Sequence, residues 1–193
     1  LMVDLSPLVG ILEQGGVVAC PTETWLGLLA DARNPAAIER VAQLKGRPAT
    51  MPIALLLPDA DALEEVAEPL GEPARALCAD HWPGPLTLVV PAKVELNPRL
   101  TRDGKVGVRV PGPSPALDLT RAFGHALTAT SANLTGQPPL RSVDELPESL
   151  AAGVDGTVPG ISPGGAPSTS TDTTTAPMTV LREGAIEIDP TAL

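Results

Sequence analysis

The chain has 193 residues, a length that suits one domain with a full hydrophobic core. Its 13 Lys and Arg residues against 23 Asp and Glu residues give a formal charge of -10, so little or no direct binding of nucleic acid is expected. Two Trp, one Phe and no Tyr are also too few for the aromatic platforms on which single-stranded nucleic acids stack.

The two cysteines, Cys20 and Cys78, belong to no CxxC or Cys/His spacing. Neither a zinc site nor a disulfide framework is therefore expected, and the reducing cytoplasm is the expected location. The N-terminal segment lacks a basic n-region, and no apolar run approaches the roughly 20 residues of a membrane helix. The sequence thus predicts a cytoplasmic protein with no protein metal site and no membrane segment.

The first part of the chain alternates between predicted helices and strands. The stretch SPLVGILEQGG predicts a helix capped by Ser6, and a short buried strand follows at 17–20. The stretch NPAAIERVAQLKG predicts a second helix, with Asn34 as its cap and Gly46 past its end. The uninterrupted apolar run PIALLLP then predicts a strand that is buried on both faces.

The rest of the chain continues the alternation. Helices are predicted over 60–67, over 73–80 and in SPALDLTRAFG, and strands are predicted in LTLVVPA, KVGVRVP and ALTATSAN. The Gly/Pro/Ser/Thr-rich stretch 153–177 is interpreted as a loop inside the domain, because MTVLREGAIEI after it recovers strand character. These patterns predict a single α/β domain over 1–193, built on a twisted open mixed sheet with flanking helices.

Polar residues recur at the ends of the predicted strands, where ligands of open α/β sheets gather. They comprise hydroxyl and amide side chains, one carboxylate and three cations: Thr22, Glu23, Thr24, Lys45, Arg47, Arg109, Ser131 and Asn133. If the strand ends converge, this set forms a cationic cavity suited to phosphates and a carboxylate.

Each of these residues also has a structural interpretation. Thr22 and Thr24 could only turn the chain, Lys45 could only stabilise a helix end, and Arg109 could pair with any acidic neighbour. No Ser/His/Asp set, HExxH, GxGxxG or Walker loop is present, so hydrolase, zincin and dinucleotide-binding functions have no support.

Seven ordered blocks between residues 15 and 186 carry a family resemblance. They are GGVVACPTETWLGLLADA, LKGRPATMPIALLL, HWPGPLTLVV, VGVRVPGPSPALDL, TATSANLTGQPP, APSTSTD and VLREGAI. In this order they resemble the YrdC-like (TsaC) family of L-threonylcarbamoyladenylate synthases.

The resemblance implies a nucleotidyltransferase that forms threonylcarbamoyl-AMP and pyrophosphate from L-threonine, bicarbonate or CO2, and ATP, with Mg²⁺ accompanying the ATP. It implies that the product passes to a partner protein complex that modifies a tRNA adenosine. It further implies the YrdC-like fold around a positively charged cavity. Because longer relatives continue into a second domain, the sequence resembles the short, single-domain form.

The resemblance also implies roles for individual residues. Those expected to bind ATP are Lys45, Arg47, Ser131, Asn133, Ser142 and Arg182, of which Lys45 and Arg47 are also the expected catalytic cations. Those expected to bind threonine are Thr22, Arg109 and Ser168.

Three features depart from the family pattern. Relatives often carry an aromatic residue where this chain has Leu26, and here the bulky aromatic is Trp25. Lys105 stands where relatives often have Ser or Thr, and STSTD is more polar than the usual STIVD. We therefore expect a different pocket wall at Trp25, a further charge near the nucleotide or an outward-facing side chain at Lys105, and a less certain strand at 168–172.

Two other functions are weighed against this one. The first is a non-catalytic module of the same fold that binds RNA or a ribosomal particle, which the charge of -10 disfavours. The second is the carbamoyl-transfer domain of hydrogenase maturation proteins, which lies in a much larger chain beside a zinc-finger-like module. The absence of CxxC pairs from this sequence disfavours it.

Overall fold

The computed structural model describes residues 4–191. Its helices are α1 (Ser6–Glu13), α2 (Pro35–Lys45), α3 (Leu63–Val66), α4 (Glu72–His81), α5 (Pro115–Phe123) and α6 (Glu148–Ala151), with a 3₁₀ helix η1 (Val143–Glu145). Its strands are β1 (Val18–Pro21), β2 (Leu26–Leu29), β3 (Ala54–Leu56), β4 (Leu86–Pro91), β5 (Thr101–Arg102), β6 (Lys105–Arg109), β7 (Leu127–Ser131), β8 (Gly156–Thr157), β9 (Thr169–Asp172) and β10 (Thr179–Arg182). None of the helices in this range is long and apolar enough to cross a membrane.

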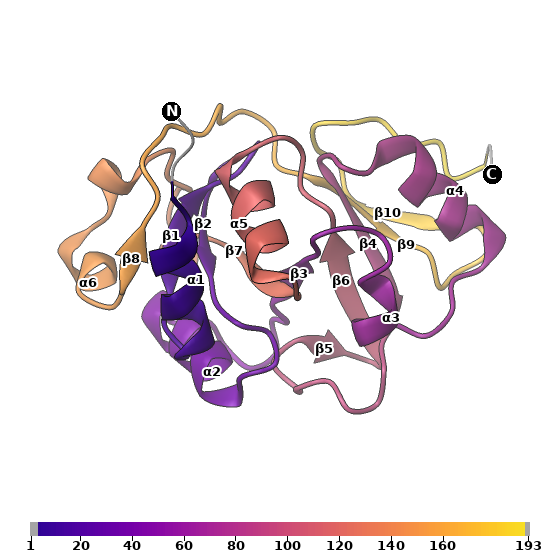
Figure 1. The fold of residues 1–193 in the computed structure, drawn as a ribbon. Coiled ribbons are helices and arrows are strands. Elements are labelled where there is room, and N and C mark those ends of the chain that lie inside the picture. Colours follow the sequence, from indigo (N-terminus) through magenta and orange to yellow (C-terminus); the bar gives the residue numbers. More distant parts are fainter. Residues whose placement is uncertain (1–3, 192–193) are drawn as a thin grey trace.

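The strands form one open mixed sheet (Figure 1). Their order is β10-β9-β4-β6-β3-β7-β2-β1-β8, and β5 pairs with β6. The pairs β1–β8, β3–β6 and β4–β9 are parallel, and the other neighbours are antiparallel. The predicted α/β architecture with a mixed open sheet and flanking helices is confirmed.

Most local predictions are also confirmed, with exceptions in α1, at β2 and in the stretch 153–177. That stretch is not a loop throughout, because it contains β8 and β9, which form by parallel pairing with β1 and β4. Helix α2 begins at the Asn34 cap, whose side chain accepts hydrogen bonds from two backbone N–H groups, and it ends at Gly46 in the left-handed conformation. Ser6 was wrongly predicted as a cap: it lies inside α1, and Leu5 occupies the cap position without a side-chain hydrogen bond. The sequence patterns also missed β2, because the run LGLLA is too short and too uniformly apolar to show alternation.

Helices cover both faces of the sheet around β1. Alternate residues of a strand point to opposite faces, and Val18 and Cys20 pack in one hydrophobic cluster with Leu12 of α1 and Leu119 of α5. Ala19 packs in the other cluster, together with residues of α2. This part of the sheet is therefore a three-layer structure.

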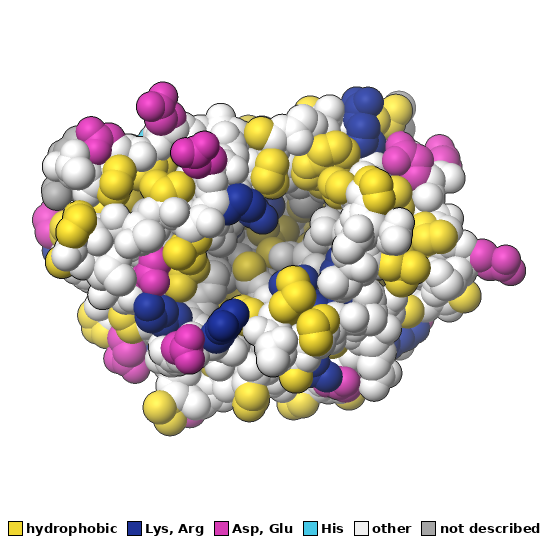
Figure 2. All heavy atoms as spheres, turned by 180° about the vertical axis from the view of Figure 1, so that it is seen from behind, with side chains coloured by type: hydrophobic (Ala, Val, Ile, Leu, Met, Phe, Trp, Pro, Cys, Tyr) yellow, Lys and Arg dark blue, Asp and Glu magenta, His cyan; other side chains and the backbone are white. Residues whose placement is uncertain are grey.

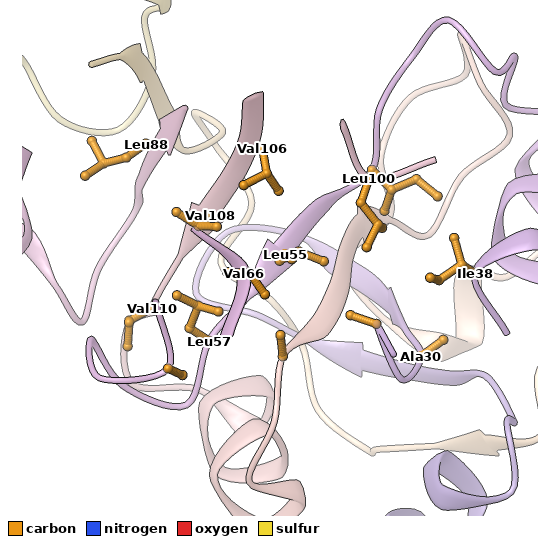
Figure 3. Packing of buried hydrophobic residues seen from close by; sticks show 14 of the residues in the cluster. Ala30, Ile38, Leu55, Leu57, Val66, Leu88, Leu100, Val106, Val108 and Val110 are labelled. Atoms are coloured by element: carbon orange, nitrogen blue, oxygen red, sulfur yellow. The ribbon is translucent and has the colours of Figure 1, made fainter. Parts of the chain in front are cut away.

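The sheet around β4 and β6 has helices on one face only. Leu88 and Val108 gather with Leu57, Val66 and Val110 in the main core (Figure 3), a cluster that also contains Leu77 and Cys78 of α4. The intervening residues of the same strands point the other way, and no helix of the described chain covers them; they are Thr87, Val89, Lys105, Gly107 and Arg109. The uncovered face becomes the floor of a cleft.

Candidate functional site

A deep cleft opens on the side of the molecule opposite to α5, with Lys and Arg side chains along its margin and inside it (Figure 2). It has two adjoining compartments of about 350 Å³ and about 590 Å³. Both are lined by the same six residues, which form a shared wall: Arg109, Ala129, Thr130, Ser131, Ser168 and Arg182. The ends of β6, β7 and β10 and the start of β9 therefore converge at one place, as the polar strand ends predict.

The smaller compartment is bounded by the tight loop between β1 and β2. The Thr22 hydroxyl accepts hydrogen bonds from the backbone N–H of Thr24 (3.0 Å) and of Trp25 (3.1 Å) and donates one to the Trp25 carbonyl (2.7 Å). Thr22, Trp25 and Leu26 all line the compartment. Thr22 thus lies where the sequence predicts a binding residue, but its hydroxyl already holds the loop together. Trp25 contributes to the wall beside Leu26 and does not replace it.

Arg109 lies on the shared wall and forms a buried ion pair with Glu23. Its Nη1 lies 2.5 Å from Glu23 Oε1, and the two side chains are only 9% and 12% exposed. Burial lowers the pKa of Arg109 below its usual value; the charge of Glu23 opposes this shift, and the positive charge of Arg182 adds to it. A guanidinium held this way has N–H groups left over for an anion in the cleft.

Arg182 and Ser168 belong to the same shared wall. The guanidinium of Arg182 donates hydrogen bonds to the Ser168 carbonyl (Nε 3.1 Å, Nη2 2.7 Å) and to its hydroxyl (3.0 Å). The same hydroxyl lies 2.9 Å from Thr87 Oγ1 on β4. These bonds fix the position of Arg182, although it lies on the largely exposed edge strand β10.

The larger compartment has more basic than acidic side chains along its walls. Its charged residues are Arg47, Arg102, Lys105, Arg109 and Arg182 against Asp103 and Asp172. Arg47 donates to the carbonyls of Met51 (3.0 Å) and Pro52 (2.6 Å), so the loop after α2 holds it in place. Such a lining is suited to the phosphates of a nucleotide.

Lys105 faces the larger compartment and does not point away from the site. Its Nζ lies 2.8 Å from Asp172 Oδ2, and the side chain is 32% exposed. Burial alone would raise the pKa of Asp172, but hydrogen bonds from Lys105 and Thr174 lower it below its usual value. Gly107 lies between Lys105 and Arg109 on β6, and a Cβ there would come within 3.2 Å of Ala54 Cβ. The absence of a side chain at Gly107 therefore avoids crowding against Ala54 on this face of the sheet.

Lys45 lines neither compartment. Its Nζ donates to the carbonyl of Ser131 (2.5 Å) and to the carbonyl and Oδ1 of Asn133 (2.7 Å and 3.1 Å). The residue is 2% exposed, and burial, followed by the charge of Arg47, lowers its pKa to about 8. Lys45 thus fixes the backbone after β7, where Ser131 Oγ also donates to Asn133 Oδ1 (2.5 Å).

Among the strand-end residues, Thr24 lines the smaller compartment and Glu23 lines neither. Ser142 is the other residue with a predicted binding role that does not line the cleft. It precedes η1, its hydroxyl lies 3.4 Å from a carboxylate oxygen of Glu145, and its backbone pairs with that of Ile161. The remaining predicted residues do reach the cleft; they are Thr22, Arg47, Arg109, Ser131, Asn133, Ser168 and Arg182.

Several lining residues were not predicted from the sequence. They are polar or small residues on the floor strands, namely Thr87, Gly107, Ser170 and Asp172. For Lys105 the sequence left two orientations open, and the side chain lines the larger compartment. A signal for some of the missed residues is present in β4, where Thr87 alternates with the apolar Leu86 and Leu88. Alternation of this kind marks a strand with one face on the core and the other open.

Comparison with known proteins identifies relatives of the whole fold. A family model named Sua5/YciO/YrdC and described as telomere recombination matches residues 10–184. Among curated proteins, the chain is 38% identical over 165 residues to the threonylcarbamoyl-AMP synthase of Bacillus subtilis, covering 84% of this chain and 46% of the relative. It is 40% identical over 144 residues to the threonylcarbamoyl-AMP synthase of Idiomarina loihiensis, covering 72% and 77%.

A solved structure with the same fold contains an amino acid. It is the crystal structure of P. abyssi Sua5 complexed with L-threonine, which superimposes with a TM-score of 0.87 at 34% identity. The alignment covers 92% of this chain and 53% of that one. The chain therefore spans about half the length of this relative and of the B. subtilis protein.

Proposed function

Because the chain belongs to the Sua5/YciO/YrdC family, we propose that it is an L-threonylcarbamoyladenylate synthase. The reaction would combine L-threonine, bicarbonate or CO2, and ATP into threonylcarbamoyl-AMP and pyrophosphate. The observation that carries this proposal is the cleft, whose two compartments meet at Arg109, Ser168 and Arg182. Two substrates placed in these compartments would have their reacting groups at the shared wall.

The smaller compartment suits the amino acid. Arg109 can bind its carboxylate through charge-assisted hydrogen bonds, and Thr22 and Ser168 provide oxygen atoms beside it. The similarity to P. abyssi Sua5, whose structure was solved with L-threonine, supports threonine as the occupant.

The larger compartment suits the phosphates of ATP. Arg47 faces it alone, whereas Ser131 and Arg182 face both compartments, so these three residues can bind successive parts of the nucleotide. Asn133 would contact the nucleotide from the end of β7. The assignment of Lys45 and Ser142 to ATP stays a prediction, and Lys45 would act on the nucleotide through the wall that it holds.

The chemistry asks the protein mainly for position and charge. The threonine amine would attack CO2 and lose a proton, which gives a carbamate. A carbamate oxygen would then attack the α-phosphorus of ATP, and the bond to the β-phosphate would break with release of pyrophosphate. Two like charges 4 Å apart repel by about 4 kcal/mol at an effective dielectric of 20, so the arginines of the cleft would be needed to bring these anions together.

Magnesium would enter with the nucleotide. Mg²⁺ is commonly bound by substrate phosphates together with one or two carboxylates. The larger compartment fits this requirement, because Asp103 and Asp172 lie on its wall. When bound, the ion would neutralise part of the triphosphate charge.

The proposal extends to the cellular context. The product would pass to a protein complex that modifies a tRNA adenosine, and both steps would take place in the cytoplasm. Residues 1–193 would act as one catalytic domain, with little or no direct binding of nucleic acid.

A direct assay tests the proposal. The purified chain is incubated with ATP, Mg²⁺, bicarbonate and isotopically labelled amino acids, and the adenylate is identified by mass spectrometry. We expect pyrophosphate and an adenylate that carries the threonine label. Absence of this product, together with retention of RNA in a filter-binding assay across salt concentrations, would favour the RNA-binding alternative.

A further inference from the structure

Glu23 has no role in the function proposed above, although it is the ion-pair partner of Arg109. It belongs to the loop between β1 and β2 and reaches Arg109 from outside the two compartments, since Glu23 lines neither of them. Arg109 lines both. Glu23 can therefore affect a ligand in the cleft only through Arg109 or through its electric field.

The arrangement leaves part of the Glu23 carboxylate without a partner. Oε1 accepts the bond from Arg109, but Oε2 is buried and has no hydrogen-bond partner within residues 4–191. Burying an unpaired carboxylate oxygen costs free energy, so each such group in a native structure calls for an explanation. Gly112 leaves space for the Glu23 side chain, because a Cβ at position 112 would lie only 3.1 Å from Glu23 Cγ.

The charge of Glu23 changes the electrostatics of the smaller compartment. The only charged residues on its described lining are Arg109 and Arg182, which contribute two positive charges. With the negative charge of Glu23 behind Arg109, the local charge falls from two to one. A monoanion is attracted less strongly as a result, whereas a zwitterion loses attraction at its carboxylate and gains it at its ammonium group.

We infer that Glu23 sets the preference of the smaller compartment for a zwitterionic amino acid over a plain carboxylate or phosphate anion. This rests on the proposed function, in which Arg109 binds the carboxylate of threonine. Glu23 acts as a positioning and specificity-determining residue through Arg109. It would keep free phosphate and pyrophosphate out of the amino-acid compartment while the neighbouring compartment attracts phosphates.

The test compares two ligands of the same shape and different charge. L-Threonine is a zwitterion, and 2,3-dihydroxybutyrate of matching stereochemistry replaces the ammonium group by a hydroxyl, which leaves a monoanion. Their dissociation constants are measured by calorimetry on the wild type and on Glu23→Gln. We expect Glu23→Gln to shift the ratio of the two constants about tenfold in favour of the monoanion, as removal of one nearby charge would do.

Two control variants separate charge from structure. Glu23→Asp keeps the charge and should keep the wild-type ratio even where both ligands bind more weakly. Glu95→Gln removes an exposed carboxylate outside both compartments and should change neither constant. A Glu23→Gln variant that weakens both ligands equally, or leaves the ratio unchanged, would show a merely structural role and overturn the inference.

The wild type provides a second measurement that does not depend on the folding of any variant. We expect 2,3-dihydroxybutyrate to bind at least about tenfold more weakly than threonine. Equal affinities would contradict the inference. If the wild type forms no threonine-dependent adenylate, the proposed function fails; if it forms one and the ratio in Glu23→Gln is unchanged, only the inference fails.

Discussion

Two groups of polar residues at the cleft differ in how their hydrogen-bonding groups are used. In the group after β7, Lys45, Ser131 and Asn133 hydrogen-bond to one another. In the second group, Arg109 and Arg182 each have a single residue with acceptors for their guanidinium groups among the described side chains and backbone. The first group is internally satisfied, and the second keeps N–H donors for a ligand.

This difference shows that a Lys or Arg that stands out in a sequence can belong to either group: it can stabilise the protein or bind a ligand. A buried lysine whose three N–H groups all have acceptors stabilises the protein before any ligand arrives. A buried arginine with one acidic partner has donors to spare. Substitutions in the first group should therefore act on activity through stability, whereas those in the second should weaken ligand binding directly, whatever they also do to stability.

Arg109→Ala is expected to have the largest effect. It removes the proposed carboxylate ligand, so kcat/KM for threonine should fall about 100-fold or more while KM for ATP stays nearly constant. It also leaves Glu23 as a buried, unpaired charge, which should lower the free energy of unfolding by about 3–5 kcal/mol. Urea unfolding and steady-state kinetics measure the two effects.

The double variant Arg109→Ala/Glu23→Gln is the matched control for this prediction. It should recover part of the lost stability, because no uncompensated charge stays buried, but none of the threonine binding. Recovery of threonine binding in the double variant would remove Arg109 from the proposed site.

Lys45→Ala is expected to act on stability first. It leaves the carbonyls of Ser131 and Asn133 and the Asn133 side chain without their donor, which should cost about 3 kcal/mol in urea unfolding. Activity should fall as a consequence, because the first group is displaced. A variant with wild-type stability and no activity would instead favour direct contact between Lys45 and a phosphate.

Arg47→Ala should affect ATP binding more than stability, in contrast to Lys45→Ala. Arg47 faces the larger compartment and is held only by two carbonyls of its own loop, so its loss should cost about 1 kcal/mol of stability. KM for ATP should rise about tenfold, since a charge-assisted hydrogen bond contributes about that much, and KM for threonine should change little. Arg47→Lys should keep part of the affinity; equal KM values for ATP in the wild type and Arg47→Ala would contradict the assignment.

The two groups also differ in how far the sequence could predict their positions. The convergence of Arg109, Ser131 and Asn133 was predictable, because strand ends of an open α/β sheet meet along one edge. The hydrogen bonds by which Lys45 fixes the backbone after β7 were not predictable, because its three acceptors come from a segment 86 to 88 residues further along the chain. Thr22 was open to two interpretations, and the structure supports both: it lines the compartment and it closes the loop.

Helices and strands were likewise predictable where local signals define them and hard to predict where distant contacts do. Helix α2 was predictable to the residue because its cap and its terminal glycine are local signals in the sequence. Strand β9 was hard to predict because TSTD has weak strand character, and it forms by parallel pairing with the distant β4. Pairing partners far along the chain decide such segments, so tertiary contacts override local preference.

Lys105→Thr should have the smallest effect and tests whether the second group extends along β6. Lys105 is partly exposed and already paired with Asp172, so its field on a bound nucleotide is weakened by both its partner and the solvent. We expect KM for ATP to rise about two- to fivefold at low ionic strength and the difference to vanish near 1 M salt, where the Debye length is about 3 Å. Arg75→Ala, which removes an exposed cation of α4 paired with Glu72, should show no such change. A salt-independent loss in Lys105→Thr would mean that the lysine holds β9 through Asp172 and does not act on the nucleotide by its charge.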